Sequence, residues 1–86
     1  MVNMHLVKLF GLRIRELRES KKISQEKLSF STGFHRTYIG MIERGERNIS
    51  LANMAVFAKV FKINLSELLD FKSINSFEDY ELKLKK

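Results

Sequence analysis

Two short segments that each end at a glycine constrain the fold of this chain more than any other feature. The first is QEKLSFST, which follows Ser24, a good helix N-cap, and precedes Gly33. Glycine readily takes the left-handed conformation that ends a helix, so we expect this segment to be a short helix. The second segment begins near His35 and runs to Arg44, with Gly45 as its stop. The pattern therefore predicts two short helices joined by a glycine turn.

Two helices joined so tightly must cross closely, and their apolar positions indicate how. Leu28 in the first helix and Ile39 and Ile42 in the second supply the contact, and Ser29 is small enough to allow it. With both isoleucines facing inward, the polar start of the second helix forms an exposed tip. The residues expected outside or at the edge are Arg36, Thr37, Gly40 and Met41. A helix presented in this way fits the major groove of DNA, where the first residues of a recognition helix reach base edges.

Apolar residues at helical spacing predict further helices on both sides of this pair. The first runs roughly over residues 6–21, and its Gly11 indicates close packing against a neighbouring element. Ser50 is the expected N-cap of another helix over residues 51–61. The chain has no proline and few strand signals, so the predicted fold is all-α, a compact five-helix domain with a helix-turn-helix at its second and third helices.

The last helix and the tail are less sharply marked in the sequence. Ser66 is the expected N-cap of a short helix over residues 67–71, which closes a domain of residues 1–71. The extension over residues 72–86 alternates apolar and charged residues at its end but also fits helical spacing. We expect a short helix or partial disorder there.

Composition excludes several classes of function. The 86 residues include no cysteine and only two histidines, which argues against disulfides, thiol catalysis and a metal site. No nucleophile–base pair, glycine-rich phosphate loop or plausible carboxylate pair is visible, so we expect no enzyme activity, no cofactor and no small-molecule ligand. The net charge of +6 instead favours a polyanionic partner. No apolar run reaches membrane-spanning length and no signal peptide is recognisable, so we expect a cytoplasmic protein that does not bind membranes.

A longer stretch of the chain resembles a known family. The segment RIRELRESKKISQEKLSFSTGFHRTYIGMIERGERN is similar to the lambda-repressor-like helix-turn-helix family of XRE type, over about residues 6–71. Within it, RTYIGMIERGERN resembles the controller proteins of restriction–modification systems. Three positions depart from the family pattern: Ser29 stands where alanine is usual, Thr32 where an aliphatic residue is frequent, and Ile49 where proline is frequent.

The resemblance implies roles for individual residues. The implied contacts to DNA bases are made by Arg36, Thr37, Met41 and Arg47. The implied contacts to phosphates are made by Gln25, Tyr38, Asn48 and Ser50. The family also implies a structural ion pair between Arg18 and Glu43. His35 is expected to start the helix, and Phe30 either packs near the Tyr38 ring or meets a partner.

The resemblance implies a sequence-specific, double-stranded DNA-binding transcriptional regulator that acts as a homodimer on an operator. The best-matching subtype is a controller of a restriction–modification system. Alternatives are an antitoxin, a phage-type repressor, or a protein-interaction module that no longer binds DNA. One helix-turn-helix covers few base pairs, so a twofold dimer is expected. The predicted interface comprises Phe61, Ile63, Leu65, Leu68 and Leu69; in the competing interpretation they are core and the dimer forms only on DNA.

Overall fold

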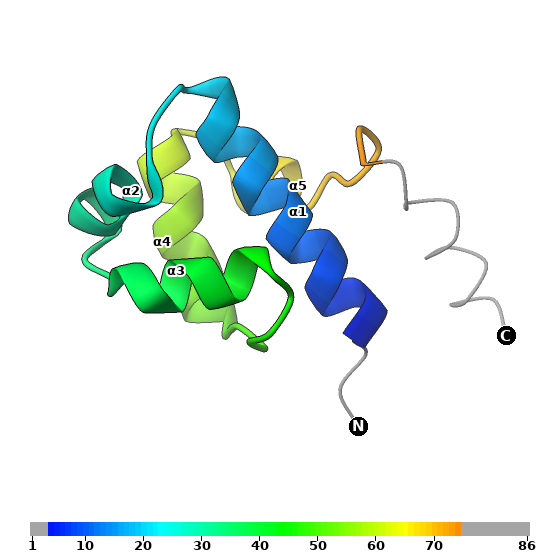
Figure 1. Ribbon diagram of the computed structural model, residues 1–86. Coiled ribbons are helices and arrows are strands. Elements are labelled where there is room, and N and C mark those ends of the chain that lie inside the picture. The colour runs from blue at the N-terminus through cyan, green and yellow to red at the C-terminus, as the bar shows by residue number, and fades with distance from the viewer. Residues whose placement is uncertain (1–3, 75–86) are drawn as a thin grey trace, which may run out of the picture.

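The fold is a bundle of helices. The computed structural model describes residues 4–74 and contains α1 (Met4–Ser20), α2 (Gln25–Thr32), α3 (Arg36–Glu43), α4 (Leu51–Phe61) and α5 (Leu65–Leu68), with no strand among those residues (Figure 1). The predicted all-α class and the helix-turn-helix at the second and third helices are therefore confirmed. The expectation for the tail falls outside the described residues from position 75 onward. None of the helices in the described part has the length and apolar composition needed to cross a membrane.

The predicted caps fix the ends of the central helices. The Ser24 side chain accepts a hydrogen bond from Lys27 N, and the Ser50 side chain accepts one from Asn53 N. Gly33 ends α2 with a φ of 79°, in the left-handed region where a side chain would be strained. These local signals settle where the two helices of the motif start and stop.

The expected start of the fifth helix is wrong by two residues. Asn64, not Ser66, is the N-cap of α5, because its side chain accepts from Glu67 N while the Glu67 side chain accepts from Asn64 N. This reciprocal capping box satisfies two backbone donors at once, which a serine at position 66 could not do. The Ser66 hydroxyl instead donates to Asn64 Oδ1 at 2.6 Å.

The core lies between α1, the helix pair and α4. Its largest fully buried side chains include Phe57 and Phe61 from α4 and Ile14 from α1. The Phe57 ring lies 6.4 Å from the Phe10 ring and 5.3 Å from the Phe34 ring, measured between centroids. Because Phe57 touches aromatic rings from α1 and from the turn before α3, α4 supports the helix pair from behind.

Gly11 lies where α1 packs closely against α3, as its place in the sequence indicated. A Cβ at this position would overlap the carbonyl oxygen of Ile42 and lie 2.9 Å from that of Glu43. Gly45, with a φ of 73°, makes a second close approach, to Lys8 of α1. The lack of side chains at these two positions therefore sets how α3 rests on α1.

Two of the five predicted interface residues belong to the protein's own core. Phe61 is 1% exposed and Leu68 is fully buried, so neither side chain is available to a partner. Their burial follows from the packing of α5 against α4, which closes the apolar end of the bundle. Ile63 and Leu65 are partly buried and Leu69 is 38% exposed. The packing also continues beyond residue 71, since Ile74 contacts the core.

Candidate nucleic-acid interface

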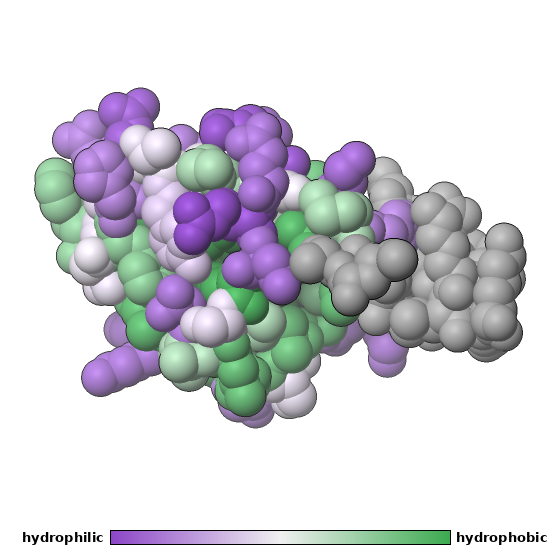
Figure 2. Space-filling view, turned by 90° about the horizontal axis from the view of Figure 1, so that it is seen from below, coloured by the Kyte–Doolittle hydropathy of each residue, from purple (hydrophilic) through white to green (hydrophobic). Residues whose placement is uncertain are grey.

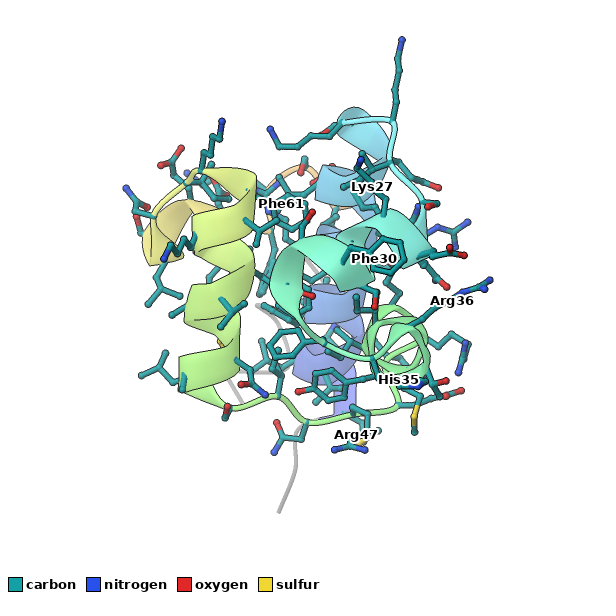
Figure 3. The ribbon with its side chains drawn as sticks, turned by 90° about the vertical axis from the view of Figure 1, so that its left-hand side faces the viewer. Lys27, Phe30, His35, Arg36, Arg47 and Phe61 are labelled. Atoms are coloured by element: carbon teal, nitrogen blue, oxygen red, sulfur yellow. The ribbon has the colours of Figure 1, made fainter. Side chains whose placement is uncertain are left out.

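The start of α3 is exposed on the side opposite its buried isoleucines. Ile39 and Ile42 are buried in the core, whereas Arg36 and Thr37 are exposed and Met41 is intermediate. Figure 3 shows Arg36 pointing away from the body of the protein. Its Nη1 lies 3.9 Å from Glu26 Oε2, a long contact between exposed groups that contributes little stability. The Arg36 guanidinium can therefore reach an external partner without breaking a strong internal bond.

His35 starts this helix, as expected. Its Nδ1 accepts a hydrogen bond from Thr37 N at 3.2 Å and so caps α3. No group of three His, Cys, Asp or Glu side chains in the described part of the chain lies close enough to hold a metal ion.

The turn between α2 and α3 is held by two of the residues that depart from the family pattern. The Ser29 hydroxyl donates to the Phe34 carbonyl at 2.6 Å. The Thr32 hydroxyl donates to the Leu28 carbonyl at 2.9 Å and accepts from Phe34 N at 3.1 Å. These hydroxyls thus bond to backbone groups at the end of α2 and just beyond Gly33. The departures therefore strengthen the turn locally.

One buried carboxylate ties α3 to α1. Glu43 of α3 accepts from Arg18 Nε at 2.7 Å and from Arg18 Nη2 at 3.0 Å, so the ion pair that the resemblance implies is present. Arg18 also donates to the Ile23 carbonyl at 2.9 Å. The hydrogen bond that Arg18 donates to Glu43 raises the pKa of Arg18, and the negative charge of Glu43 adds to the effect. The network links α1, the turn after it, and α3.

Gln25 joins this network at the start of α2. Its Nε2 donates to Glu43 Oε1 at 3.1 Å. A carboxylate can only accept, so the amide nitrogen of Gln25 must face Glu43, and its second N–H remains for another acceptor. The first backbone N–H groups of α2 have no partner within the helix, which favours an anion nearby. The bond to Glu43 was not expected from the sequence, and it fixes the Gln25 side chain at the start of α2.

Tyr38 is the centre of a second cluster. Its ring packs edge-on against Phe34, with centroids 5.2 Å apart, and the Arg47 guanidinium lies 5.1 Å from the ring centroid. Its hydroxyl accepts a hydrogen bond from Asn53 Nδ2 at 3.0 Å, which leaves the hydroxyl hydrogen for another acceptor. Sequence reasoning missed Asn53, because nothing local connects residues fifteen positions apart on different helices. The cluster brings the loop after α3 onto the same part of the surface as α3.

Phe30 does not pack on Tyr38, because Phe34 occupies that place. Its ring is 76% exposed on the outer side of α2. Asn48 is exposed in the loop, and Ser50 begins α4 with its hydroxyl hydrogen still available. In the view from below, which faces α3 and the loop to α4, hydrophilic side chains cover much of the surface and an apolar area adjoins them (Figure 2).

Arg44 is a basic residue of this surface that sequence reasoning did not assign. It follows the last residue of α3, and its guanidinium lies over Gly40, one helical turn back. Its Nη2 lies 3.0 Å from Glu46 Oε1, and the hydrogen bond to Glu46 raises the pKa of Arg44. The spacing of Arg36, Gly40 and Arg44 at intervals of four was a signal in the sequence for a shared helix side.

Comparison with known proteins identifies the family. Residues 14–68 match the helix-turn-helix family HTH_3. The control protein C.BamHI of Bacillus amyloliquefaciens is 48% identical over 71 residues, which are 81% of this chain and 88% of that protein. The restriction–modification controller protein C.AhdI of Aeromonas hydrophila has a crystal structure that covers 72% of this chain and 94% of its own, at 47% identity and a TM-score of 0.69.

A third similar protein, the restriction–modification controller C.Esp1396I, has a structure that covers 74% of this chain and 87% of its own. Its identity is 28% and its TM-score is 0.67. For that protein a nucleoprotein complex has also been solved. The matches span the helix-turn-helix and the helices that support it. This chain belongs to the helix-turn-helix family and, within it, to the restriction–modification controller proteins.

Proposed function

We propose that this regulator binds a specific double-stranded operator as a homodimer and controls a restriction–modification system. Its family consists of DNA-binding transcriptional regulators and not of enzymes. The observation that carries the proposal is the exposed start of α3, where Arg36 and Thr37 lie opposite the buried Ile39 and Ile42. A helix supported in this way can enter the major groove with its first turn foremost.

Base recognition is assigned to the side chains at the exposed side of α3. Arg36 suits bidentate pairing with guanine, because its fork of donors matches the O6 and N7 acceptors. Thr37 and Met41 can contact a base edge or a thymine methyl group. Arg47, which lies over the Tyr38 ring, can reach a second base or the backbone from the loop.

Backbone contacts position the protein on the duplex. Gln25 has a free N–H after its bond to Glu43, and Tyr38 has a free hydroxyl hydrogen after its bond from Asn53. Both groups are therefore donors held in place by internal bonds, which suits phosphate oxygens. Asn48 and Ser50 supply two further polar groups in the loop and at the start of α4.

A dimer follows from the small footprint of one recognition helix. Two such helices related by a twofold axis should lie about 34 Å apart, one turn of DNA. With Phe61 and Leu68 committed to the core, the proposed interface is formed by Ile63, Leu65 and Leu69. Sedimentation of the free protein at micromolar concentration tests this. A monomer there, with Leu65→Asp or Leu69→Asp leaving cooperative operator binding intact, would contradict the interface.

Among the alternatives, the likeness to C.BamHI and C.AhdI favours a controller over an antitoxin or a phage-type repressor. A protein-interaction module that no longer binds DNA would be expected to carry acidic or apolar residues at the start of α3, where this chain has Arg36 and Thr37. Neighbouring genes for a methyltransferase and an endonuclease would support the controller assignment. A neighbouring toxin gene would contradict it and favour an antitoxin.

Binding to two duplexes tests the DNA-reading role. One duplex is selected by the wild-type protein from a random pool, and the other has a mixed sequence. Arg36→Ala should weaken binding to the selected duplex by about 1–3 kcal/mol and flatten discrimination at one base pair. Lys59→Ala, which removes the same charge from the exposed surface of α4, is the matched control. Equal weakening on both duplexes would mean that Arg36 touches only phosphate.

A further inference from the structure

The Arg44 side chain folds back along α3 instead of extending into solvent. If Gly40 carried a Cβ, that atom would lie 3.1 Å from Arg44 Nη1 and 3.9 Å from Arg44 Cζ. Long side chains on a helix lean toward its N-terminus, so Arg44 naturally covers the residue four positions earlier. The guanidinium therefore lies against the bare backbone at Gly40, toward the start of the helix.

This position brings Arg44 near the side chain proposed to bind phosphate at the start of α2. Gln25 Oε1 lies 3.6 Å from the same Cβ position at Gly40, so Gln25 and the Arg44 guanidinium both lie beside this glycine. Gln25 is held there by its bond to Glu43. An anion that meets the start of α2 would thus also meet the guanidinium of Arg44.

Glu46 is the internal competitor for this guanidinium. Its Oε1 lies 3.0 Å from Arg44 Nη2, and both side chains are about half exposed. An exposed ion pair of this kind is weak, so a phosphate oxygen can replace the carboxylate. While the pair is intact, Glu46 also places a negative charge beside the surface that would approach DNA.

We propose that Arg44 is an additional phosphate-binding residue of the DNA-binding surface, seated on Gly40 next to Gln25, and that Glu46 weakens DNA binding by competing with the phosphate for it. The inference rests on the proposed DNA-binding function and extends it. Because a phosphate carries no sequence information, Arg44 adds affinity without specificity. By weakening this phosphate contact, Glu46 reduces the binding of unrelated sequences. Base contacts then supply a larger share of the binding free energy on the operator.

The experiment measures the affinity of Arg44→Gln, Glu46→Gln and the double variant by fluorescence anisotropy across a salt series. The probes are the selected duplex and the mixed-sequence duplex. Arg44→Gln should weaken both equally, by about fivefold per bound protomer at 0.15 M salt, and reduce the slope of log K against log salt by about 1. Glu46→Gln should tighten both by about two- to fivefold. In the Arg44→Gln background, Glu46→Gln should have no effect.

Charge-matched controls separate this competition from a general change in net charge. Lys59→Gln removes one positive charge from α4. In Figure 3 this helix lies on the left and Arg36 on the right, so the substitution should leave the affinity for DNA nearly unchanged. Both Arg44 and Glu46 are exposed, so thermal melting should show that every variant stays folded. If Glu46→Gln tightens binding as much without Arg44 as with it, the effect is long-range repulsion and the competition is overturned.

Two other results would also overturn the inference, and they differ in what they leave standing. If Arg44→Gln changes neither affinity nor slope while Arg36→Ala still loses discrimination, DNA reading holds and the Arg44 contact is wrong. A loss confined to the selected duplex would make Arg44 a base reader instead. If the wild-type protein binds no duplex at any salt concentration, the proposed function fails as well.

Discussion

Gly11→Ala adds a single methyl group where α1 crosses α3, and the surrounding atoms cannot move aside independently. The new Cβ would overlap the Ile42 carbonyl oxygen and lie 2.9 Å from the Glu43 carbonyl oxygen. Both atoms belong to the backbone of α3, so relief requires the two helices to separate. The same two residues hold the core and the Arg18 network, which makes that separation unfavourable.

The expected magnitude combines two opposing effects. Overpacking of an ordered interior costs about 1–3 kcal/mol, and a backbone obstacle places this site at the upper end. Alanine is a better helix former than glycine by up to about 1 kcal/mol, which offsets part of the loss. We therefore expect the free energy of unfolding to fall by about 2 kcal/mol. For a domain of this size that corresponds to a melting temperature about 10 °C lower.

Thermal melting followed by circular dichroism measures this effect, with Gly40→Ala as the matched control. A Cβ at Gly40 would lie 3.1 Å from Arg44 Nη1, the end of a flexible side chain that can move. Gly40→Ala should therefore leave the melting temperature unchanged or raise it. If Gly11→Ala melts at or above the wild-type temperature, the argument that backbone contact sets the spacing of α1 and α3 is refuted.

Three further substitutions probe stability. Glu43→Ala should lower the free energy of unfolding by about 3 kcal/mol, because it leaves Arg18 largely buried without its carboxylate; a variant that melts normally yet does not bind DNA would instead give Glu43 a direct role. Arg13→Ala should lower the free energy of unfolding, measured in urea, by about 2 kcal/mol, because the Arg13 guanidinium donates to the carbonyls of Glu67 and Leu68 at the end of α5. An unchanged unfolding midpoint would show that these two hydrogen bonds are dispensable. Lys62→Gly should raise the melting temperature by a few degrees, because Lys62 ends α4 with a φ of 60° that glycine adopts without strain. A lower melting temperature would mean that the larger conformational entropy of glycine in the unfolded chain outweighs the relief of backbone strain.

The helix ends were predictable because their causes are local. Ser24, Gly33 and Ser50 each act on backbone groups within three or four residues, so the sequence carries the information directly. The start of α5 was equally readable, since Asn64 and Glu67 have the spacing of a capping box. Choosing Ser66 there overlooked a signal that was present.

Contacts between elements were harder to predict because periodicity defines the apolar side of a helix but not what covers it. Phe61 and Leu68 fit a partner surface as well as a core until the packing of α4 and α5 is known. The same reason hid the bonds from Asn53 to Tyr38 and from Gln25 to Glu43. The resemblance supplied the Arg18–Glu43 pair, which spacing alone would not have given.

The Glu43 network has a consequence for how such a protein can diversify. Arg18, Gln25 and Glu43 share one set of bonds, so a change at any of them disturbs three helices at once. Arg36 and Thr37 stand outside this network with exposed side chains. Under the proposed function, new side chains at those two positions alter the preferred DNA sequence while the scaffold keeps its shape. Recognition and folding are thus separable traits in this chain, and a duplicated gene could acquire a new operator through a handful of codons.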